Sequence, residues 1–115
     1  MDEQTIMRGI LNSYPYPIVF VDDSYIIRYM NRYAMYYYYQ ERGYGDLIGK
    51  CIFDCHDKES SVQHIRDCFE KMKRDGKEVF VGVSLRNQRI YMQPVRDDGG
   101  RLIGFFERFE LNQQL

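Results

Sequence analysis

Apolar residues recur at helical spacing in two segments of the chain. The first segment, residues 2–13, carries one apolar stripe: Ile6, Met7, Ile10 and Leu11. This spacing predicts an amphipathic helix. The helix should end before Pro15, because proline disfavours helical conformation in the preceding residue. A second stripe predicts a longer helix that begins at Ser60 or Ser61 and reaches about Arg74. Its members are Val62, Ile65, Phe69 and Met72.

Short runs rich in β-branched and aromatic residues predict five strands. Their expected ranges are 18–21, 25–30, 78–85, 89–95 and 102–111. Two groups of turn-forming residues, Asp22-Asp23-Ser24 and Asp97-Asp98-Gly99-Gly100, lie between consecutive strands. Because these residue types favour turn conformations, both groups indicate β-hairpins.

Helices should separate the second strand from the third. Asn31 can cap a helix over 32–42, and Gly43 should end it. A short helical turn is expected over 46–52, followed by a polar loop over 53–59. This order of elements predicts an α+β fold, in which an antiparallel sheet carries its helices on one face. At 115 residues the chain has room for one such domain.

Charge and hydropathy argue against several classes of partner. The formal net charge is −1 and basic residues are interleaved with acidic ones, so a nucleic-acid interface is not expected. No apolar run approaches the ~20 residues that cross a bilayer. The acidic start Met1-Asp2-Glu3 does not resemble a signal peptide. Together with the odd number of cysteines, three, these features favour the reducing cytoplasm.

Histidine and cysteine are the candidate ligands for a metal or cofactor. His56 and His64 are the two histidines, and isolated histidines carry little specificity. The Cys51-x-x-x-Cys55-His56 pattern is one residue longer than the motif for covalent haem attachment. Zinc would need Cys68 or His64 to complete four ligands. We therefore expect no metal site, and we expect Cys51 and Cys68 to be small core residues.

Tyrosine is concentrated in the first part of the chain. The run Tyr36-Tyr37-Tyr38-Tyr39 would place rings all round one helical turn, so some rings should face the core and others a ligand, an interface or water. Asp22-Asp23 and Asp97-Asp98 have turn roles, so they are not candidates for paired catalytic carboxylates. No nucleophile motif, phosphate loop or HExxH motif occurs. We therefore expect binding and not catalysis.

Four motifs in order resemble the PAS domain family, the small sensory modules of signalling proteins. The segment Pro17-Ile18-Val19-Phe20-Val21-Asp22 is similar to the family's first strand and turn. Asn31 is similar to the asparagine that follows its second strand. Asp46-Leu47-Ile48-Gly49-Lys50 is similar to the step into the middle helices. Asp97 to Gly104 is similar to the final hairpin, where a glycine follows a hydrophobic pair.

The resemblance covers essentially the whole chain and implies its architecture. The PAS fold has a five-stranded antiparallel sheet in the order 2-1-5-4-3. Residues 1–13 would be an N-terminal flanking helix, 14–111 the PAS domain, and 112–115 a tail or the start of a linker. The resemblance also implies a sensory role in a larger, bacterial-type signalling protein. A bound small molecule would shift packing, and the flanking helix and a homodimer would carry the shift to an output domain.

The resemblance places a ligand pocket between the middle helices and the inner face of the sheet. Its expected lining comprises Ile52, Ile65, Phe69, Phe80, Met92 and Phe106, with Tyr38 as a further candidate. For each strand residue the neighbouring residue is the alternative, because side chains alternate between the two faces of a strand. Such a lining suits a small ring-bearing or amphipathic ligand.

The cofactor and the mode of action stay open from the sequence. Haem-binding relatives supply an axial ligand from the region of His56 and His64, so a haem or redox sensor is one alternative. A dimerisation module with a filled core is another. Flavin is disfavoured, because Lys50-Cys51-Ile52-Phe53-Asp54-Cys55 lacks the arginine and glutamine of flavin-binding relatives. Cys55-His56 and Gly76-Lys77 also resemble bacterial PAS domains fused to hemerythrin-like domains, although those have prolines where this chain has Asp57-Lys58-Glu59.

Overall fold

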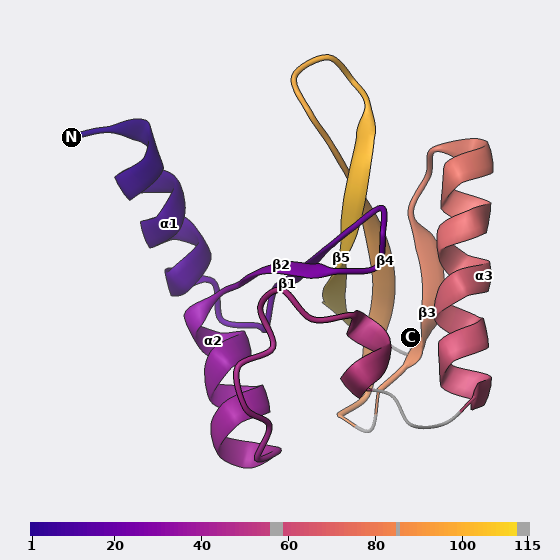
Figure 1. The fold of residues 1–115 in the computed structure, drawn as a ribbon, viewed down its shortest axis with the longest axis horizontal. Helices are drawn as coiled ribbons and strands as arrows, with labels where there is room; N and C mark the ends of the chain where they lie inside the picture. Colours follow the sequence, from indigo (N-terminus) through magenta and orange to yellow (C-terminus); the bar gives the residue numbers. More distant parts are fainter. Residues whose placement is uncertain (56–58, 85, 113–115) are drawn as a thin grey trace.

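The structure is a computed structural model that describes residues 1–55, 59–84 and 86–112 (Figure 1). The helices are α1 (Glu3–Ser13), α2 (Arg32–Met35), the π-helix η1 (Tyr36–Glu41), the 3₁₀-helix η2 (Ile52–Cys55) and α3 (Glu59–Asp75). The strands are β1 (Val19–Asp22), β2 (Ile27–Met30), β3 (Val79–Val83), β4 (Gln88–Arg96) and β5 (Leu102–Leu111).

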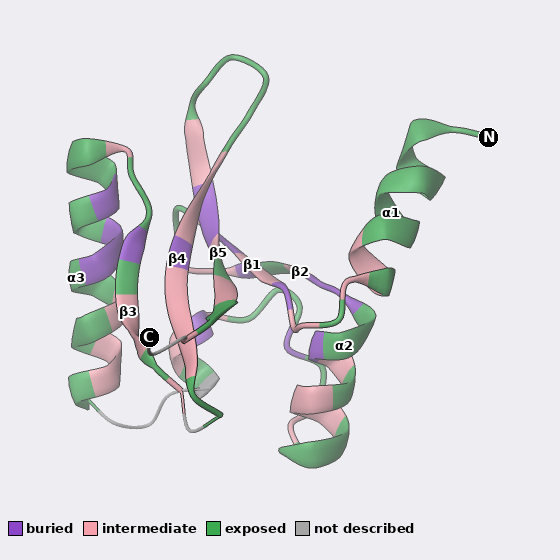
Figure 2. Cartoon of the chain, turned by 180° about the vertical axis from the view of Figure 1, so that it is seen from behind, coloured by how far each residue is buried: buried purple, intermediate pink, exposed green. Residues whose placement is uncertain are grey.

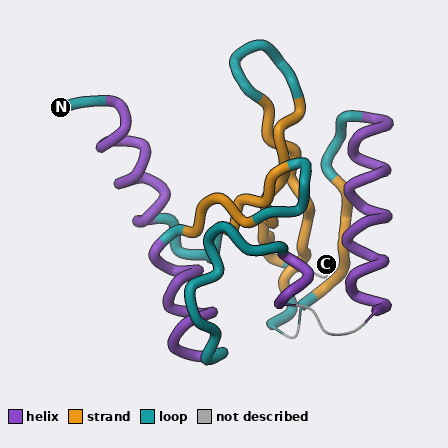
Figure 3. Tube along the Cα trace, viewed as in Figure 1, coloured by secondary structure: helices purple, strands orange, loops and turns teal. Residues whose placement is uncertain are grey.

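The strands form one antiparallel sheet in the order β2-β1-β5-β4-β3. This confirms the predicted α+β fold and its strand order. Figure 3 shows α2 and α3 at opposite ends of the sheet, with a long loop running from η1 back toward the sheet before η2 begins. We call the face of the sheet against which these helical segments pack the inner face of the domain.

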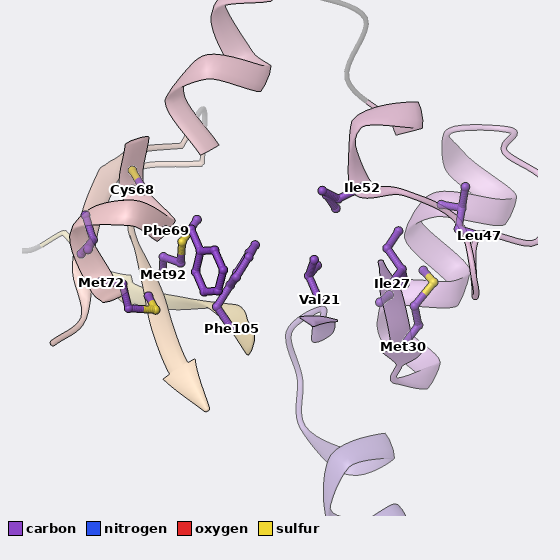
Figure 4. Packing of buried hydrophobic residues seen from close by; sticks show 12 residues of the cluster. Val21, Ile27, Met30, Leu47, Ile52, Cys68, Phe69, Met72, Met92 and Phe105 are labelled. Carbon is purple, nitrogen blue, oxygen red and sulfur yellow. The ribbon is translucent and has the colours of Figure 1, made fainter. Parts of the chain in front are cut away.

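The buried apolar side chains form one cluster with two parts (Figure 4). The part beside α3 contains Cys68, Phe69, Met72, Met92 and Phe105. The part beside β2 contains Ile27, Met30 and Leu47. Val21, on β1, lies between the two parts. The core thus holds each end of the sheet against its own helical segment.

Helix α1 forms where the apolar stripe predicted it, but it packs little against the domain. Asp2 caps it, since its side chain accepts a hydrogen bond from the Thr5 N–H at 2.7 Å. No residue of α1 is buried, and Figure 2 shows most of the helix exposed. Ile6, Met7 and Ile10 are 46%, 49% and 63% exposed, so the apolar stripe is open to solvent.

Two predicted helical segments differ in the structure. The helix expected over 32–42 is an α-helix only to Met35 and continues as a π-helix, in which the Arg42 N–H donates to the Tyr37 carbonyl. The pattern of apolar positions in the sequence does not distinguish the backbone hydrogen bonding of an α-helix from that of a π-helix. The turn expected over 46–52 is a non-helical segment tied to β2, because Gly49 N–H donates to the Ile27 carbonyl at 2.7 Å. The helical turn begins only at Ile52.

Candidate functional site

A cavity of about 1220 Å³ opens between the α2–η1 segment and α3, over the inner face of the sheet. Its floor is formed by strand side chains: Val21, Ile90, Met92, Phe105, Glu107 and Phe109. Helical side chains also border it: Tyr33, Tyr36, Tyr37, Tyr38, Ile52 and Ile65. Ligand pockets in proteins commonly measure ~300–1000 Å³, so this opening can accommodate a small organic molecule.

The strand register sets which side chains reach the cavity. Met92 lies opposite Glu107, and Ile90 lies opposite Phe109, between β4 and β5. Residues directly opposite each other in an antiparallel pair share one face. Since Phe105 is buried against the core at 3% exposure, this set of alternating positions defines the inner face.

Two of the predicted pocket residues lie on the other face of the sheet. Phe80 is 47% exposed and its ring lies 5.5 Å from that of Tyr91. Phe106 precedes Glu107 and pairs in register with Gln93, so it also points away from the cavity. The choice of which alternating side chains of β3 and β5 face the cavity was therefore wrong by one residue.

The other predicted pocket residues fall in two groups. Ile52, Ile65, Met92 and Tyr38 border the cavity, and their contact with a ligand stays a prediction. Phe69 is fully buried in the core beside the cavity, where its ring packs 5.5 Å from that of Tyr25 and 5.1 Å from that of Phe105. It packs against Phe105 of the cavity floor and does not itself border the cavity.

His64 is the histidine that the structure describes, and it lies away from the cavity. His64 is exposed on α3, with Nε2 3.3 Å from the Val81 carbonyl oxygen and 3.9 Å from Cys68 Sγ. It is not among the residues that border the cavity. His56 and the side chain of Cys55 lie outside the described residues. Among the described residues, no group of three or more histidine, cysteine or acidic side chains is placed to hold a metal ion.

The cysteines differ in their surroundings. Cys68 is buried and Cys51 is half-buried, and both are free thiols. Burial raises the pKa of the Cys68 thiol, and the nearby Asp67 and Glu107 carboxylates raise it further. Cys68 is therefore poorly suited to act as a nucleophile or a thiolate ligand.

Three tyrosines of η1 border the cavity: Tyr36, Tyr37 and Tyr38. The rings of Tyr37 and Tyr38 meet edge to face at 5.0 Å, and Tyr38 also packs against Tyr44 at 6.3 Å. The guanidinium of Arg42 lies over Tyr37 at 5.9 Å and over Tyr44 at 5.4 Å. These contacts hold the rings in place, so η1 borders the opening with aromatic side chains that also carry a polar hydroxyl.

Sequence reasoning missed Glu107, the acidic residue on the cavity floor. Its side chain is exposed, because solvent enters the open cavity. Protein also surrounds it, and this burial raises the pKa of its carboxyl. The protein around Glu107 therefore displaces part of the water from its carboxylate even in the empty cavity, and a ligand that dries the cavity would remove the rest. The position of Glu107 between Phe105 and Phe109 is the one sequence signal for this role.

No helix within the described residues has the length and apolar character to span a membrane. A sequence model of the PAS domain matches residues 7–110 of the chain. A comparison with curated protein sequences gives no significant match.

Several solved structures are similar to this one. A C-terminal domain from Streptococcus mutans is 21% identical with a TM-score of 0.69, over 90% of this chain and 81% of that one. A sensory box sensor histidine kinase from Vibrio cholerae is 13% identical with a TM-score of 0.62, over 93% and 89% of the two chains. The PAS domain of a protein from Colwellia psychrerythraea is 14% identical with a TM-score of 0.67, over 97% and 100%. These likenesses show the fold. Together with the sequence match over residues 7–110, they establish that the chain belongs to the PAS domain family.

Proposed function

We propose that the chain is the sensory module of a larger, cytoplasmic signalling protein and that it acts by binding and not by catalysis. A small ring-bearing or amphipathic molecule would bind in the cavity over the inner face of the sheet. Binding would favour one packing arrangement of the helices, and the flanking helix α1 would carry the change to an output domain. A ligand can bias such an equilibrium only by its different affinities for the two states.

The observation that carries this proposal is the position of the cavity. It is bordered by both helical segments of the domain and also by Asn12, Pro15, Tyr16 and Pro17, which include the end of α1 and the link to β1. A molecule in the cavity would therefore touch the segment that joins α1 to the sheet. The sensor histidine kinase from Vibrio cholerae gives the proposal a precedent in a related fold.

A thermal-shift screen of small molecules tests the proposal. At about 100 times its Kd, a compound that binds the folded state alone stabilises it by ~2.7 kcal/mol. Ile65→Trp should fill the cavity from α3 and abolish the rise in melting temperature, because Ile65 borders the opening. Phe80→Trp is the matched control, since Phe80 lies on the outer face, and it should keep the rise. If no compound stabilises the wild type, or both variants respond like it, the proposal is wrong.

A second function, dimerisation through α1, is favoured by a separate observation. Ile6, Met7 and Ile10 form an exposed apolar stripe on α1. Burying such a surface contributes ~25 cal/mol per Å², and a second copy of the chain offers a matching stripe. Light scattering should give a homodimer for the intact chain and a monomer for a chain lacking residues 1–13. A monomer in both cases would exclude this role for α1.

Haem sensing through a histidine has less support. His64 contacts the Val81 carbonyl and does not border the cavity, so an axial ligand from this position would have to bind outside it. An absorption spectrum of the purified protein would test the alternative directly. A haem band would favour it over the small-molecule sensor proposed here.

A further inference from the structure

Glu107 occupies an apolar part of the cavity floor. Along β5, its neighbours on the same face are Phe105 and Phe109. Across the sheet, Met92 lies directly opposite it on β4, and Ile90 lies opposite Phe109. All four neighbours are hydrocarbon or thioether side chains, which cannot compensate a negative charge. A carboxylate that loses its water in such surroundings is destabilised unless a cation or a hydrogen-bond donor replaces that water.

The described part of the protein does not supply that partner. No hydrogen bond or ion pair joins Glu107 to another described residue. The adjacent Arg108 points to the outer face, where it pairs with Glu78 and Glu110 and lies 4.5 Å above the Tyr91 ring. Burial accordingly raises the pKa of the Glu107 carboxyl.

The other ionisable groups around the cavity lie on different elements. Arg32 on α2, Glu41 on η1 and Arg86 before β4 border the cavity and are exposed. The Cys68 thiol on α3 is close enough for the Glu107 charge to raise its pKa. The tyrosine hydroxyls that border the cavity belong to Tyr16, to Tyr33 on α2 and to Tyr36, Tyr37 and Tyr38 on η1. Glu107 is thus the acidic group of the floor, while Glu41 belongs to the exposed edge.

We propose that Glu107 determines the specificity of the cavity and selects a ligand that joins a protonated nitrogen to an apolar or aromatic body. This rests on the proposed function, because it requires that a ligand enters the cavity. The protonated nitrogen would replace the water lost from the carboxylate with a charge-assisted hydrogen bond. The apolar floor and the tyrosine rings of η1 would hold the apolar or aromatic body of the ligand.

Three probes that share a phenyl ring on a two-carbon chain and differ in the charge of the terminal group test the inference. Phenethylamine is a cation at neutral pH, 2-phenylethanol is neutral, and 3-phenylpropanoate is an anion. Amide chemical shifts of the ¹⁵N-labelled intact chain, followed during titration with each probe, give its Kd. We expect the wild type to bind the amine about tenfold more tightly than the alcohol, because hydrogen bonds to charged groups contribute ~1.5–3 kcal/mol. The anion should bind most weakly.

Three variants identify the residue responsible. Glu107→Gln should bring the ratio of amine to alcohol affinity to about one, because the amide keeps the shape of the side chain but carries no charge. Glu110→Gln changes the same charge on the same strand but on the outer face, and it should keep the wild-type ratio. Glu41→Gln tests the acidic residue at the exposed edge and should also keep it.

The outcomes separate this inference from the proposed function. Equal binding of all three probes, or tightest binding of the anion through Arg32 and Arg86, would show that the cavity binds ligands but that Glu107 does not select them. A preference for the amine that persists in Glu107→Gln would overturn the inference in the same way. If none of the probes changes the spectrum at millimolar concentration, the inference about Glu107 is contradicted, whereas the proposed function is decided by the thermal-shift screen.

Discussion

One buried side chain, that of Asn31, connects four segments of the chain. It is fully buried. Its Oδ1 accepts hydrogen bonds from the N–H groups of Ile18 and Ala34, both at 2.9 Å. Its Nδ2 donates to the carbonyl of Leu11 at 2.9 Å and to that of Tyr16 at 3.0 Å. Asn31 therefore caps α2 and at the same time ties the end of α1 to the start of the sheet, which is where the proposed signal must pass.

Asn31→Ala should lower the free energy of unfolding by ~2–4 kcal/mol, because it leaves two donors and two acceptors without this partner in a buried place. Asn12→Ala is a matched control. The Asn12 side chain accepts an exposed hydrogen bond from the Arg32 N–H at 2.9 Å, and its loss should cost ~1 kcal/mol or less. Chemical denaturation measures both values. Equal losses would contradict the central role given to Asn31.

Glu107 should make the stability of the ligand-free protein depend on pH. Its pKa is raised in the folded state. As pH rises, the unfolded chain therefore releases this proton first, so stability falls from the ordinary glutamate range up to the folded pKa and stays lower above it. Glu107→Gln should raise the melting temperature at about pH 8 and leave it unchanged at about pH 4. Glu110→Gln, on the outer face, should lack this gain at higher pH. A gain for Glu107→Gln that is the same at both pH values would contradict the raised pKa.

At the scale of the elements, Gly104 sets how closely β5 approaches β1. A Cβ on Gly104 would lie 2.8 Å from Phe20 Cε2 and 2.9 Å from Asp22 Cα, and closer still to the Val21 carbonyl oxygen. Gly104→Ala should therefore separate β5 from β1 and lower the free energy of unfolding by at least ~2 kcal/mol.

The control for Gly104→Ala is Gly9→Ala in α1. A Cβ at Gly9 would meet nothing within 4 Å, and alanine favours a helix by up to ~1 kcal/mol over glycine. The stability of the protein should therefore stay unchanged or rise slightly. Denaturation curves of the two variants test the contrast, and a neutral Gly104→Ala would mean that the strands are less closely packed than described.

The order of the elements could be predicted from the sequence, whereas the details of the site could not. Apolar residues at helical spacing located α1 and α3, and turn-forming residues located the hairpins, because both signals are local in the sequence. The faces of β5 were not distinguishable, since Phe105 and Phe106 are both large and apolar. An acidic residue next to these phenylalanines in the sequence is expected to face solvent. Sequence analysis therefore did not identify Glu107 as part of the cavity floor. The three-dimensional register was needed to place it.

At the scale of the whole molecule, each part of the core packs one helical segment against its own end of the sheet. Between them the inner face stays open as a cavity of about 1220 Å³. A domain of 115 residues has a limited core with which to stabilise itself, so a molecule that fills this opening would add contacts to both parts at once. Binding would thereby couple the α2–η1 segment to α3.

The location of a bound ligand tests this account most directly. Isotope-filtered nuclear Overhauser spectroscopy would use the wild-type chain with the compound that gives the largest thermal shift. We predict contacts from the ligand protons to the side chains of Ile65, Ile90 and Met92, which border the cavity. Contacts confined to the outer face, at residues such as Phe80 and Val83, would contradict a sensory cavity between the helices and the sheet.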